Sequence, residues 1–367
     1  MKIDFSSIKK YFSSSSGVLG PLAGILPSSK AATEKITVCD LGLSKIVLIE
    51  VSKKSNGEVC VEKFEYIRNT LRDQQPALLL KPFFEDKKFK KEGLRITLKS
   101  QGVIIRFIHF PKMKREDLDG AMKYEIEPYI PFKLDECVMD YAIVDDNVKT
   151  PDGEKMEIML VVAKRQDLTP MLEIFRSLEC KLATVDVDIL SAMAALEFFF
   201  PQDFAGHVGL LDIGTEISTL GIIRDGRPRF VRDISYGAYD VQKRVRARAG
   251  LPPEEVEHLW EKNEAFPDAV SAAIVESLEG LIGDLKASFD YYREQAHCEK
   301  PIQKLFVSGR GALNPIVLKS LSEGLGIPLE PMDVCSKLKV ADSVDAEQLR
   351  KYAAFLPVVL GLALRSE

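Results

Sequence analysis

The chain has 367 residues, of which 46% are hydrophobic and 29% charged, and its formal net charge at pH 7 is -5. This length predicts two or more sub-structures, at roughly 100 to 200 residues per domain. The composition is typical of a soluble globular protein, and no run of about 18 apolar residues is present to span a bilayer. The net negative charge argues against nucleic acid as the partner, because binding a phosphate backbone needs a basic face. The six cysteines form no CxxC pair or Cys/His cluster, which predicts reduced thiols and no structural zinc in a cytosolic protein.

Residues 1–33 differ from the rest of the chain and are predicted to form a poorly ordered leader. Phe5, Ile8 and Phe12 recur at helical spacing, four serines follow, and the stretch 17–27 carries three glycines and two prolines. The apolar part is interrupted and lies after the serine run, which excludes a signal peptide. Contact of this segment with a membrane surface is the alternative.

Two stretches of the chain repeat one pattern, in which an apolar strand ends in Asp-x-Gly and two further strands follow. The first copy contains Asp40 and Gly42, and the second contains Asp212 and Gly214. An Asn-Gly pair in the first copy and an Asp-Gly pair in the second are typical hairpin turns between the later strands. Because the elements follow each aspartate in the same order, the repeat predicts two topologically similar halves.

The segment between the two repeats has a different character and predicts a small α/β subdomain inserted in the first half. Its predicted elements are strands at 102–111 and 156–163 and helices at 116–127 and 167–180, the first of which ends at Pro128. A strand at 184–188 and an apolar helix at 189–200 close the first half. The second half continues with helices at 238–249, 252–263 and 269–295, a strand at 304–307, and helices at 314–324 and 352–365.

This organisation predicts three parts. They are a leader at 1–33, a first lobe at 34–204 with the inserted subdomain at about 95–183, and a second lobe at 205–367.

Glycine turns at the ends of strands indicate a phosphate or ribose site. The turn Ser308–Ala312 precedes a helix, where backbone N–H groups and the helix dipole face a ligand. It is not a dinucleotide fingerprint, because Asn314 stands where the third glycine belongs. Asp40 and Asp212 are candidates for holding a hydrated magnesium ion from opposite sides. The alternative left open is that the glycines serve tight turns and the aspartates cap N–H groups.

The three phosphate-type turns in this order, with an α/β segment inserted between the first two, resemble the actin-like ATPase superfamily, to which FtsA belongs. Within it, the chain is similar to the PilM family of type IV pilus assembly. The residues that carry this resemblance are Phe110-Pro111-Lys112-Met113, Tyr124-Glu125-Ile126-Glu127-Pro128-Tyr129-Ile130-Pro131-Phe132 and Asp140-Tyr141. The resemblance covers residue 36 to the C-terminus and implies an α/β actin-like ATPase fold, with two RNase-H-like halves and a small α/β subdomain inserted in the first half.

The resemblance implies that ATP and magnesium bind between the two lobes. The implied nucleotide-binding residues are Asp40, Gly42, Leu43, Ser44 and Lys45 in the first phosphate loop, Asp212, Gly214, Thr215 and Glu216 in the second, and Ser308, Gly309, Arg310, Gly311 and Ala312 in the adenosine loop. Asp40 and Asp212 are expected to hold magnesium through water. No catalytic residue is assigned, and at most a slow ATPase activity is expected.

Three positions depart from the family pattern. Val47 stands where a lysine commonly follows the first-loop aspartate, and Trp260 ends a helix that usually ends in lysine. Arg310 replaces a glycine and is expected either to stack on the base or to obstruct it. These departures keep open a degenerate scaffold without nucleotide binding, and a division-type filament-forming ATPase is the other alternative.

The resemblance also implies a cytoplasmic scaffold, peripheral to the inner membrane, that binds the N-terminal cytoplasmic peptide of a PilN-like membrane protein. The implied contact residues are Tyr129, Ile130, Pro131 and Phe132. The alternative is that this segment ends a helix and packs as core. Pilus motor ATPases and self-association are further partners left open, and no nucleic acid is expected.

Overall fold

The computed structural model of the chain describes residues 35–54, 57–69, 76–86, 88–99, 102–150, 153–253, 255–256 and 267–365. The predicted leader and most of the helix predicted at 252–263, including Trp260, lie outside these residues. The chain divides into two compact units, which are described separately. The first consists of Met1–Ala194, Leu338–Ala346 and Val358–Glu367, and the second of Ala195–Lys337 and Glu347–Pro357.

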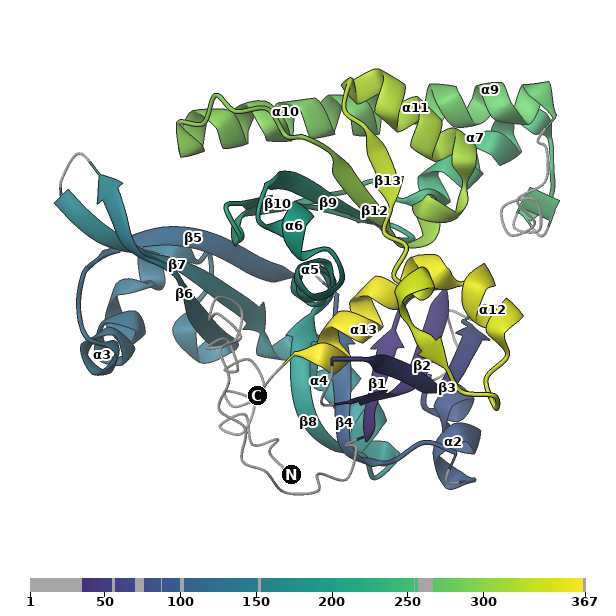
Figure 1. The fold of residues 1–367 in the computed structure, drawn as a ribbon, viewed down its shortest axis with the longest axis horizontal. Coiled ribbons are helices and arrows are strands. Elements are labelled where there is room, and N and C mark those ends of the chain that lie inside the picture. The colour runs from purple at the N-terminus through teal and green to yellow at the C-terminus, as the bar shows by residue number, and fades with distance from the viewer. Residues whose placement is uncertain are drawn as a thin grey trace. The chain divides into compact units, whose positions relative to one another are not determined.

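The first unit is built on a six-stranded sheet in the order β14-β3-β2-β1-β4-β8 (Figure 1). Its strands are β1 (Lys35–Leu41), β2 (Lys45–Lys53), β3 (Val59–Arg68), β4 (Glu92–Leu98), β8 (Lys181–Val187) and β14 (Lys339–Val340). β1, β2 and β3 pair in antiparallel fashion, whereas β4 and β8 run parallel to β1. The β-branched and apolar run of β2 is buried along almost its whole length, as is typical of a strand in the middle of a covered sheet.

The second unit repeats this connectivity in a five-stranded sheet of order β11-β10-β9-β12-β13. Its strands are β9 (His207–Ile213), β10 (Ser218–Arg224), β11 (Arg227–Ile234), β12 (Leu305–Ser308) and β13 (Leu329–Pro331). β9, β10 and β11 are antiparallel neighbours, and β12 and β13 run parallel to β9. β9 and β1 have the same length, and the aspartate is the last residue but one in both. The predicted repeat of topology is therefore confirmed.

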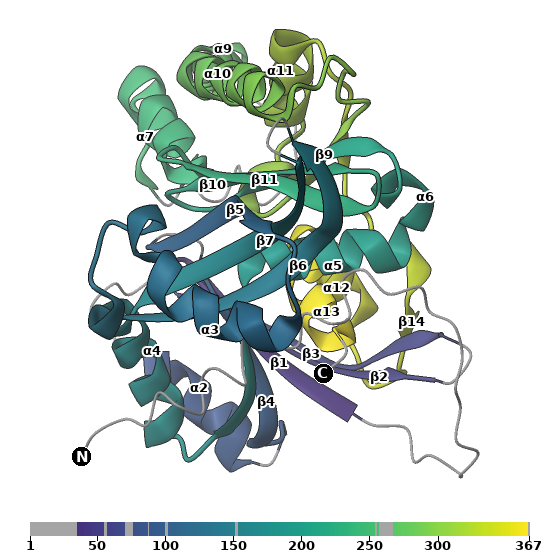
Figure 2. The same cartoon turned by 90° about the vertical axis from the view of Figure 1, so that its left-hand side faces the viewer.

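Helices cover the sheet of the second unit and enclose its apolar core. They are α7 (Ala238–Ala249), α9 (Asp268–Ser277), α10 (Glu279–Ala296) and α11 (Pro315–Leu325), with the short η3 (Arg310–Leu313). The unit also contains α6 (Pro201–Phe204) and η4 (Cys335–Lys337). α7, α9, α10 and α11 form one layer on the sheet (Figures 1 and 2). The prediction of a single helix at 269–295 is wrong in one respect, because the helix is interrupted at Leu278. Leu278 is the C-cap of α9 and the N-cap of α10.

The inserted subdomain is a three-stranded antiparallel sheet in the order β5-β7-β6, with one helix packed on it. Its elements are β5 (Val103–Pro111), α3 (Arg115–Glu125), η1 (Glu127–Tyr129), η2 (Leu134–Glu136), β6 (Cys137–Thr150) and β7 (Gly153–Lys164). The predicted helix face of Leu118, Met122 and Ile126 is buried in the core of this subdomain. The inserted sheet spans 103–164, less than the expected 95–183, because β4 and β8 pair with each other in the main sheet.

The remaining helices of the described chain are α2 (Pro76–Glu85), α4 (Arg165–Ser177), α5 (Asp188–Phe199), α12 (Ala346–Lys351), η5 (Ala353–Phe355) and α13 (Leu356–Leu364). The end of α13 is bound to the first unit. Arg95 Nη1 of β4 donates to Leu362 O at 3.1 Å and to Arg365 O at 2.7 Å, and Arg365 pairs with Asp186 of β8. The end of the described chain therefore groups with the first unit, whereas the sequence analysis placed all of 205–367 in the second lobe.

Candidate functional site

The first phosphate loop is a tight turn that joins β1 to β2. Gly42 N donates to Lys45 O at 2.8 Å, and Asn69 N donates to Ser44 O at 2.9 Å. Gly42 and Lys45 are buried in this turn, whereas Leu43 at its tip is 56% exposed. The turn places Asp40 at the end of β1 opposite Val47 of β2. The five predicted first-loop residues therefore lie together.

The Asp40 carboxylate is 1% exposed and already has three side-chain partners. Thr97 Oγ1 and Lys99 Nζ each donate to Asp40 Oδ1 at 2.7 Å, and Lys45 Nζ donates to Oδ2. Burial by itself raises the pKa of Asp40, but the ammonium groups of Lys45 and Lys99 outweigh it and hold the pKa well below its ordinary value. Asp40 is thus an ionised carboxylate whose charge is balanced by two lysines.

The second phosphate loop repeats the backbone geometry of the first. Gly214 N donates to Ile217 O at 3.0 Å, and the loop is bonded to the start of α7, because Ala238 N donates to Gly214 O and Tyr239 N to Thr215 O. A Cβ atom on Gly237 would collide with the backbone oxygen of Thr215, so only glycine fits there. Thr215 and Glu216 are half-buried.

Asp212 lies at the end of β9, where Asp40 lies at the end of β1. Ser308 Oγ of the neighbouring β12 donates to Asp212 Oδ1 at 2.7 Å, as Thr97 does to Asp40. The Asp212 side chain is half-buried, and among the described residues no lysine or arginine forms an ion pair with it. Asp212 therefore lies at a partly exposed position with the Ser308 hydroxyl as its side-chain partner.

The adenosine loop folds against the end of β9. Gly309 has a φ of +81° and donates its N–H to Ala354 O at 2.9 Å. A Cβ atom there would lie 2.6 Å from Ile213 O, and one on Gly311 would collide with the side chain of Ile213. These close approaches explain why glycine occupies both positions. Ser308 and Ala312 flank the same turn.

Arg310 is buried, which argues against stacking on a base, while the expected obstruction stays a prediction. Its side chain is 4% exposed and starts the short helix η3. A guanidinium buried in the structure is held by its own surroundings and has almost no surface with which to stack on a base.

The residues present fit a magnesium nucleotide unequally in the two halves. A hydrated magnesium ion needs one or two accessible carboxylates, and the partly exposed Asp212 meets this need. Asp40 meets it less well, because two ammonium groups already contact its oxygens. Within the described ranges, no group of three or more His, Cys, Asp or Glu residues is placed to bind a metal ion directly.

Thr97 and Lys99 were missed by the sequence analysis. Thr97 belongs to β4, a strand that the sequence analysis did not predict, and Lys99 follows directly after it. Both lie far from Asp40 along the chain, although their side chains contact its carboxylate. The apolar run 94–98 with alternating Arg95 and Thr97 was the only local signal.

The predicted partner surface divides into exposed and buried residues. Tyr129 is 41% exposed and Pro131 is exposed, whereas Ile130 is 8% exposed and belongs to the core of the inserted subdomain. Phe132 packs partly against the same core, with Lys164 Nζ 4.8 Å from its ring centroid.

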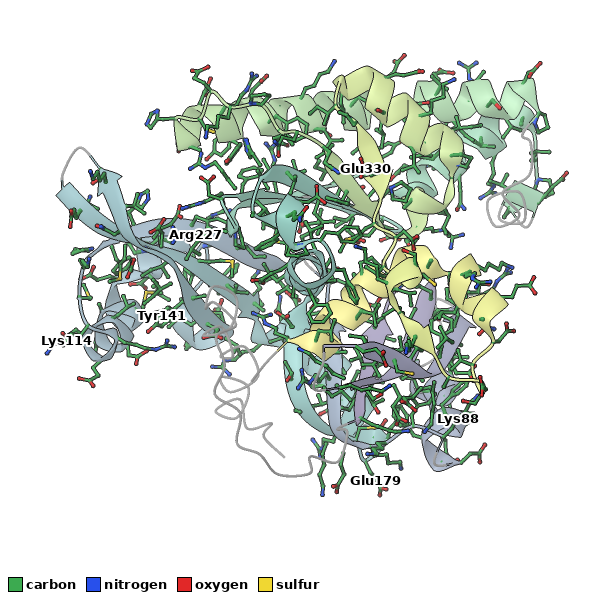
Figure 3. All side chains as sticks on the ribbon, viewed as in Figure 1. Lys88, Lys114, Tyr141, Glu179, Arg227 and Glu330 are labelled. Carbon is green, nitrogen blue, oxygen red and sulfur yellow. The ribbon has the colours of Figure 1, made fainter. Side chains whose placement is uncertain are left out.

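A hydrogen bond ties the sheet of this subdomain to its helix. Tyr141 of β6, labelled in Figure 3, donates its hydroxyl to Asp119 of α3 at 2.5 Å. The surface that carries Tyr129 is thus part of a packed unit with its own core.

No helix in the part of the chain that the structure describes combines the length and the apolar character that crossing a bilayer requires.

The comparisons with known proteins agree with this architecture. The family model of the type IV pilus assembly protein PilM matches residues 39–367. The solved PilM-PilN type IV pilus biogenesis complex is similar, with a TM-score of 0.76 and 24% sequence identity, covering 91% of this chain and 99% of that chain. The ethanolamine utilization protein EutJ from Carboxydothermus hydrogenoformans is also similar, with a TM-score of 0.51, 12% identity and 92% of each chain covered. The fold is the actin-like ATPase fold, as the sequence analysis predicted.

Proposed function

Because the chain belongs to the PilM family of type IV pilus assembly proteins, we propose that it is a nucleotide-binding scaffold that holds the cytoplasmic peptide of a PilN-like membrane protein. The nucleotide is ATP or ADP with magnesium. The scaffold is recruited to the inner membrane from the cytoplasmic side through that peptide.

The arrangement at Asp212 carries the nucleotide part of the proposal. A buried or half-buried carboxylate without a cation is costly, and the hydroxyl of Ser308 satisfies only one of its oxygens. Asp212 would hold a hydrated magnesium ion, which would supply positive charge next to the phosphates of a nucleotide. The bound nucleotide carries three phosphate groups as ATP and two as ADP, so the ligand differs before and after hydrolysis.

The exposed aromatic residue of the inserted subdomain supports the partner part of the proposal. Tyr129 offers a large, partly apolar surface on a packed subdomain, and such residues often anchor peptides. Phe132 and Pro131 extend this surface, while Ile130 supports it from below. The similarity to a PilM that is solved in complex with PilN favours a peptide of the same kind.

Titration of the purified chain with labelled ATP, with and without magnesium, tests the nucleotide part. We expect magnesium-dependent binding by the wild type and a loss of about tenfold or more in Asp212→Ala, because a charge-assisted contact is removed. Asp284→Ala, an exposed carboxylate of α10 in the same unit, is the matched control. If the wild type binds nothing at near-millimolar ATP, the chain is a scaffold without nucleotide.

Binding of a PilN-like N-terminal peptide to Tyr129→Ala and Phe132→Ala variants tests the partner part. We expect each variant to weaken binding at least several-fold, because aromatic anchors dominate such interfaces. Tyr291→Ala, a half-exposed tyrosine of the other unit, is the control. Unchanged affinity in both variants would remove these residues from the peptide site.

A further inference from the structure

Two lysines from different strands reach the carboxylate of the first phosphate loop. Val47 is fully buried and directly opposite Asp40 in the β1–β2 pair. Lys45 reaches Asp40 from the same strand as Val47, and Lys99 reaches it at 2.7 Å from the end of β4. Two ammonium groups therefore contact the Asp40 carboxylate.

The geometry of the sheet explains how these residues converge. Residues directly opposite each other in an antiparallel pair project from the same face, and so do residues two apart on one strand. Lys45 thus shares a face with Val47 and Asp40. Lys99 follows Thr97 by two positions, and Thr97 donates to Asp40 Oδ1. The end of β4 therefore places the Lys99 ammonium beside the first loop, although Lys99 is not part of that loop.

The two lysines differ in how far a ligand can reach them. The Lys45 side chain is 9% exposed, whereas that of Lys99 is 37% exposed. Lys99 Nζ also lies 3.6 Å from Asp188 Oδ2 at the start of α5. The buried carboxylates of Asp40 and Asp188 therefore hold the Lys99 ammonium in place, while its side chain stays accessible to an anion in solution.

The two lysines disfavour a metal ion at the Asp40 carboxylate. Asp40 stays ionised at neutral pH because two lysines stabilise its charge. A divalent cation would have to displace these ammonium groups from its oxygens, and it would then meet the repulsion of both lysines at short range. A phosphate group meets an accessible ammonium that is already positioned, so little ordering cost remains.

We propose that Lys99 is the phosphate-binding lysine of the first loop and that Asp40 is the positioning residue that holds it. The ligand of Lys99 is a terminal phosphate of a nucleoside di- or triphosphate. This inference rests on the proposed nucleotide function and names the lysine that contacts the phosphate and the aspartate that positions this lysine.

Calorimetric titration with ATP, ADP and AMP, with and without magnesium, tests this assignment. We expect Lys99→Met to weaken ATP and ADP binding about tenfold or more, because a charge-assisted hydrogen bond is lost. AMP lacks the β- and γ-phosphates, so its affinity is expected to change less than threefold. Lys99→Arg keeps the charge and is expected to restore most of the affinity.

A matched control and a second readout separate binding from folding. Lys181→Met removes an exposed lysine at the start of β8, where Lys181 pairs with Glu92, the first residue of β4, and should leave all affinities unchanged. Inorganic pyrophosphate is expected to raise the thermal unfolding midpoint of the wild type and of Lys99→Arg but not of Lys99→Met. If Lys99→Met is unstable, Lys99→Gln replaces it.

The outcomes distinguish the two proposals. A wild type that binds no nucleotide overturns both of them. A wild type that binds ATP while Lys99→Met binds it equally well overturns this inference alone. An equal loss of AMP and ATP affinity in Lys99→Met also overturns it, because the lysine then does not act on the terminal phosphates.

Discussion

The ends of β1 and β9 are built in the same way but carry opposite electrostatic environments. Each strand has an aspartate as its last residue but one, and each aspartate accepts a hydroxyl hydrogen bond of 2.7 Å from the next parallel strand. The glycine that follows each strand donates its N–H to a carbonyl three positions further along the chain. Asp40 is also buried against two lysines, whereas Asp212 is half-buried with no ion pair among the described residues.

This difference shows that a repeated backbone does not imply a repeated chemical role. The duplicated topology fixes where the two carboxylates lie within their own sheets. The neighbouring side chains, above all Lys45 and Lys99, decide what each carboxylate can bind. The aspartate of the first copy is paired with two lysines, whereas that of the second has a hydroxyl partner among the described residues.

The largest expected effect is on the stability of the first unit. Asp40→Ala leaves Lys45 buried without one of its partners, which costs about 3–5 kcal/mol. Asp212→Ala removes a partly exposed group with one hydrogen bond and is expected to cost about 1 kcal/mol. Urea unfolding of both variants measures the difference. Equal losses would mean that the two carboxylates have the same environment after all.

The next effect is the dependence of stability on pH. The pKa of Asp40 is lower in the folded than in the unfolded chain, so its ion pairs stabilise the fold above the unfolded pKa of about 3.9 and are lost as pH falls below it. The loss is about 1.4 kcal/mol per pH unit.

Unfolding of the wild type and of Asp40→Asn between pH 5 and pH 3 measures this contribution, with Asp212→Asn as the variant of equal charge change. Over this interval, the free energy of unfolding of the wild type and of Asp212→Asn should fall by about 1 kcal/mol more than that of Asp40→Asn. If Asp40→Asn lost as much stability in acid as the wild type, the acid sensitivity would come from groups other than Asp40.

The smallest effect concerns the two hydroxyl groups. Thr97→Val removes a donor from the buried Asp40 and should cost about 1 kcal/mol, because water cannot replace it. Ser308→Ala removes a donor from the half-exposed Asp212 and should cost less, since solvent can take its place. A double-mutant cycle of each hydroxyl with its aspartate gives the two coupling energies. A stronger coupling for Ser308 than for Thr97 would reverse the comparison.

The repeated strands could be predicted because their signals are local. Asp-x-Gly after an apolar run occurs in both halves, and the strands that precede it, β1 and β9, have matching lengths with the aspartate at the same position. The buried face of α3 was likewise readable from Leu118, Met122 and Ile126, which recur every fourth residue. Such patterns depend only on the period of the element.

The charge balance at Asp40 could not be predicted, because it depends on a pairing that is distant in sequence. β4 pairs with β1 although β2, β3 and α2 lie between them in the chain, and nothing around Lys99 marks it as a neighbour of the first loop. The burial of Arg310 and the break in the long helix at Leu278 are also set by packing. The roles of the nucleotide and partner residues stay predictions.

The contacts of the last helix have a consequence for the order in which the chain folds. Arg95 bonds to the carbonyl of Leu362, and Arg365 pairs with Asp186, so both contacts join segments on either side of the second unit in the sequence. During synthesis, the first unit therefore lacks part of its structure until the whole second unit has been made. Long-range contacts of this kind slow folding, so the emerging first unit spends that time with α13 missing and its apolar surface available to chaperones.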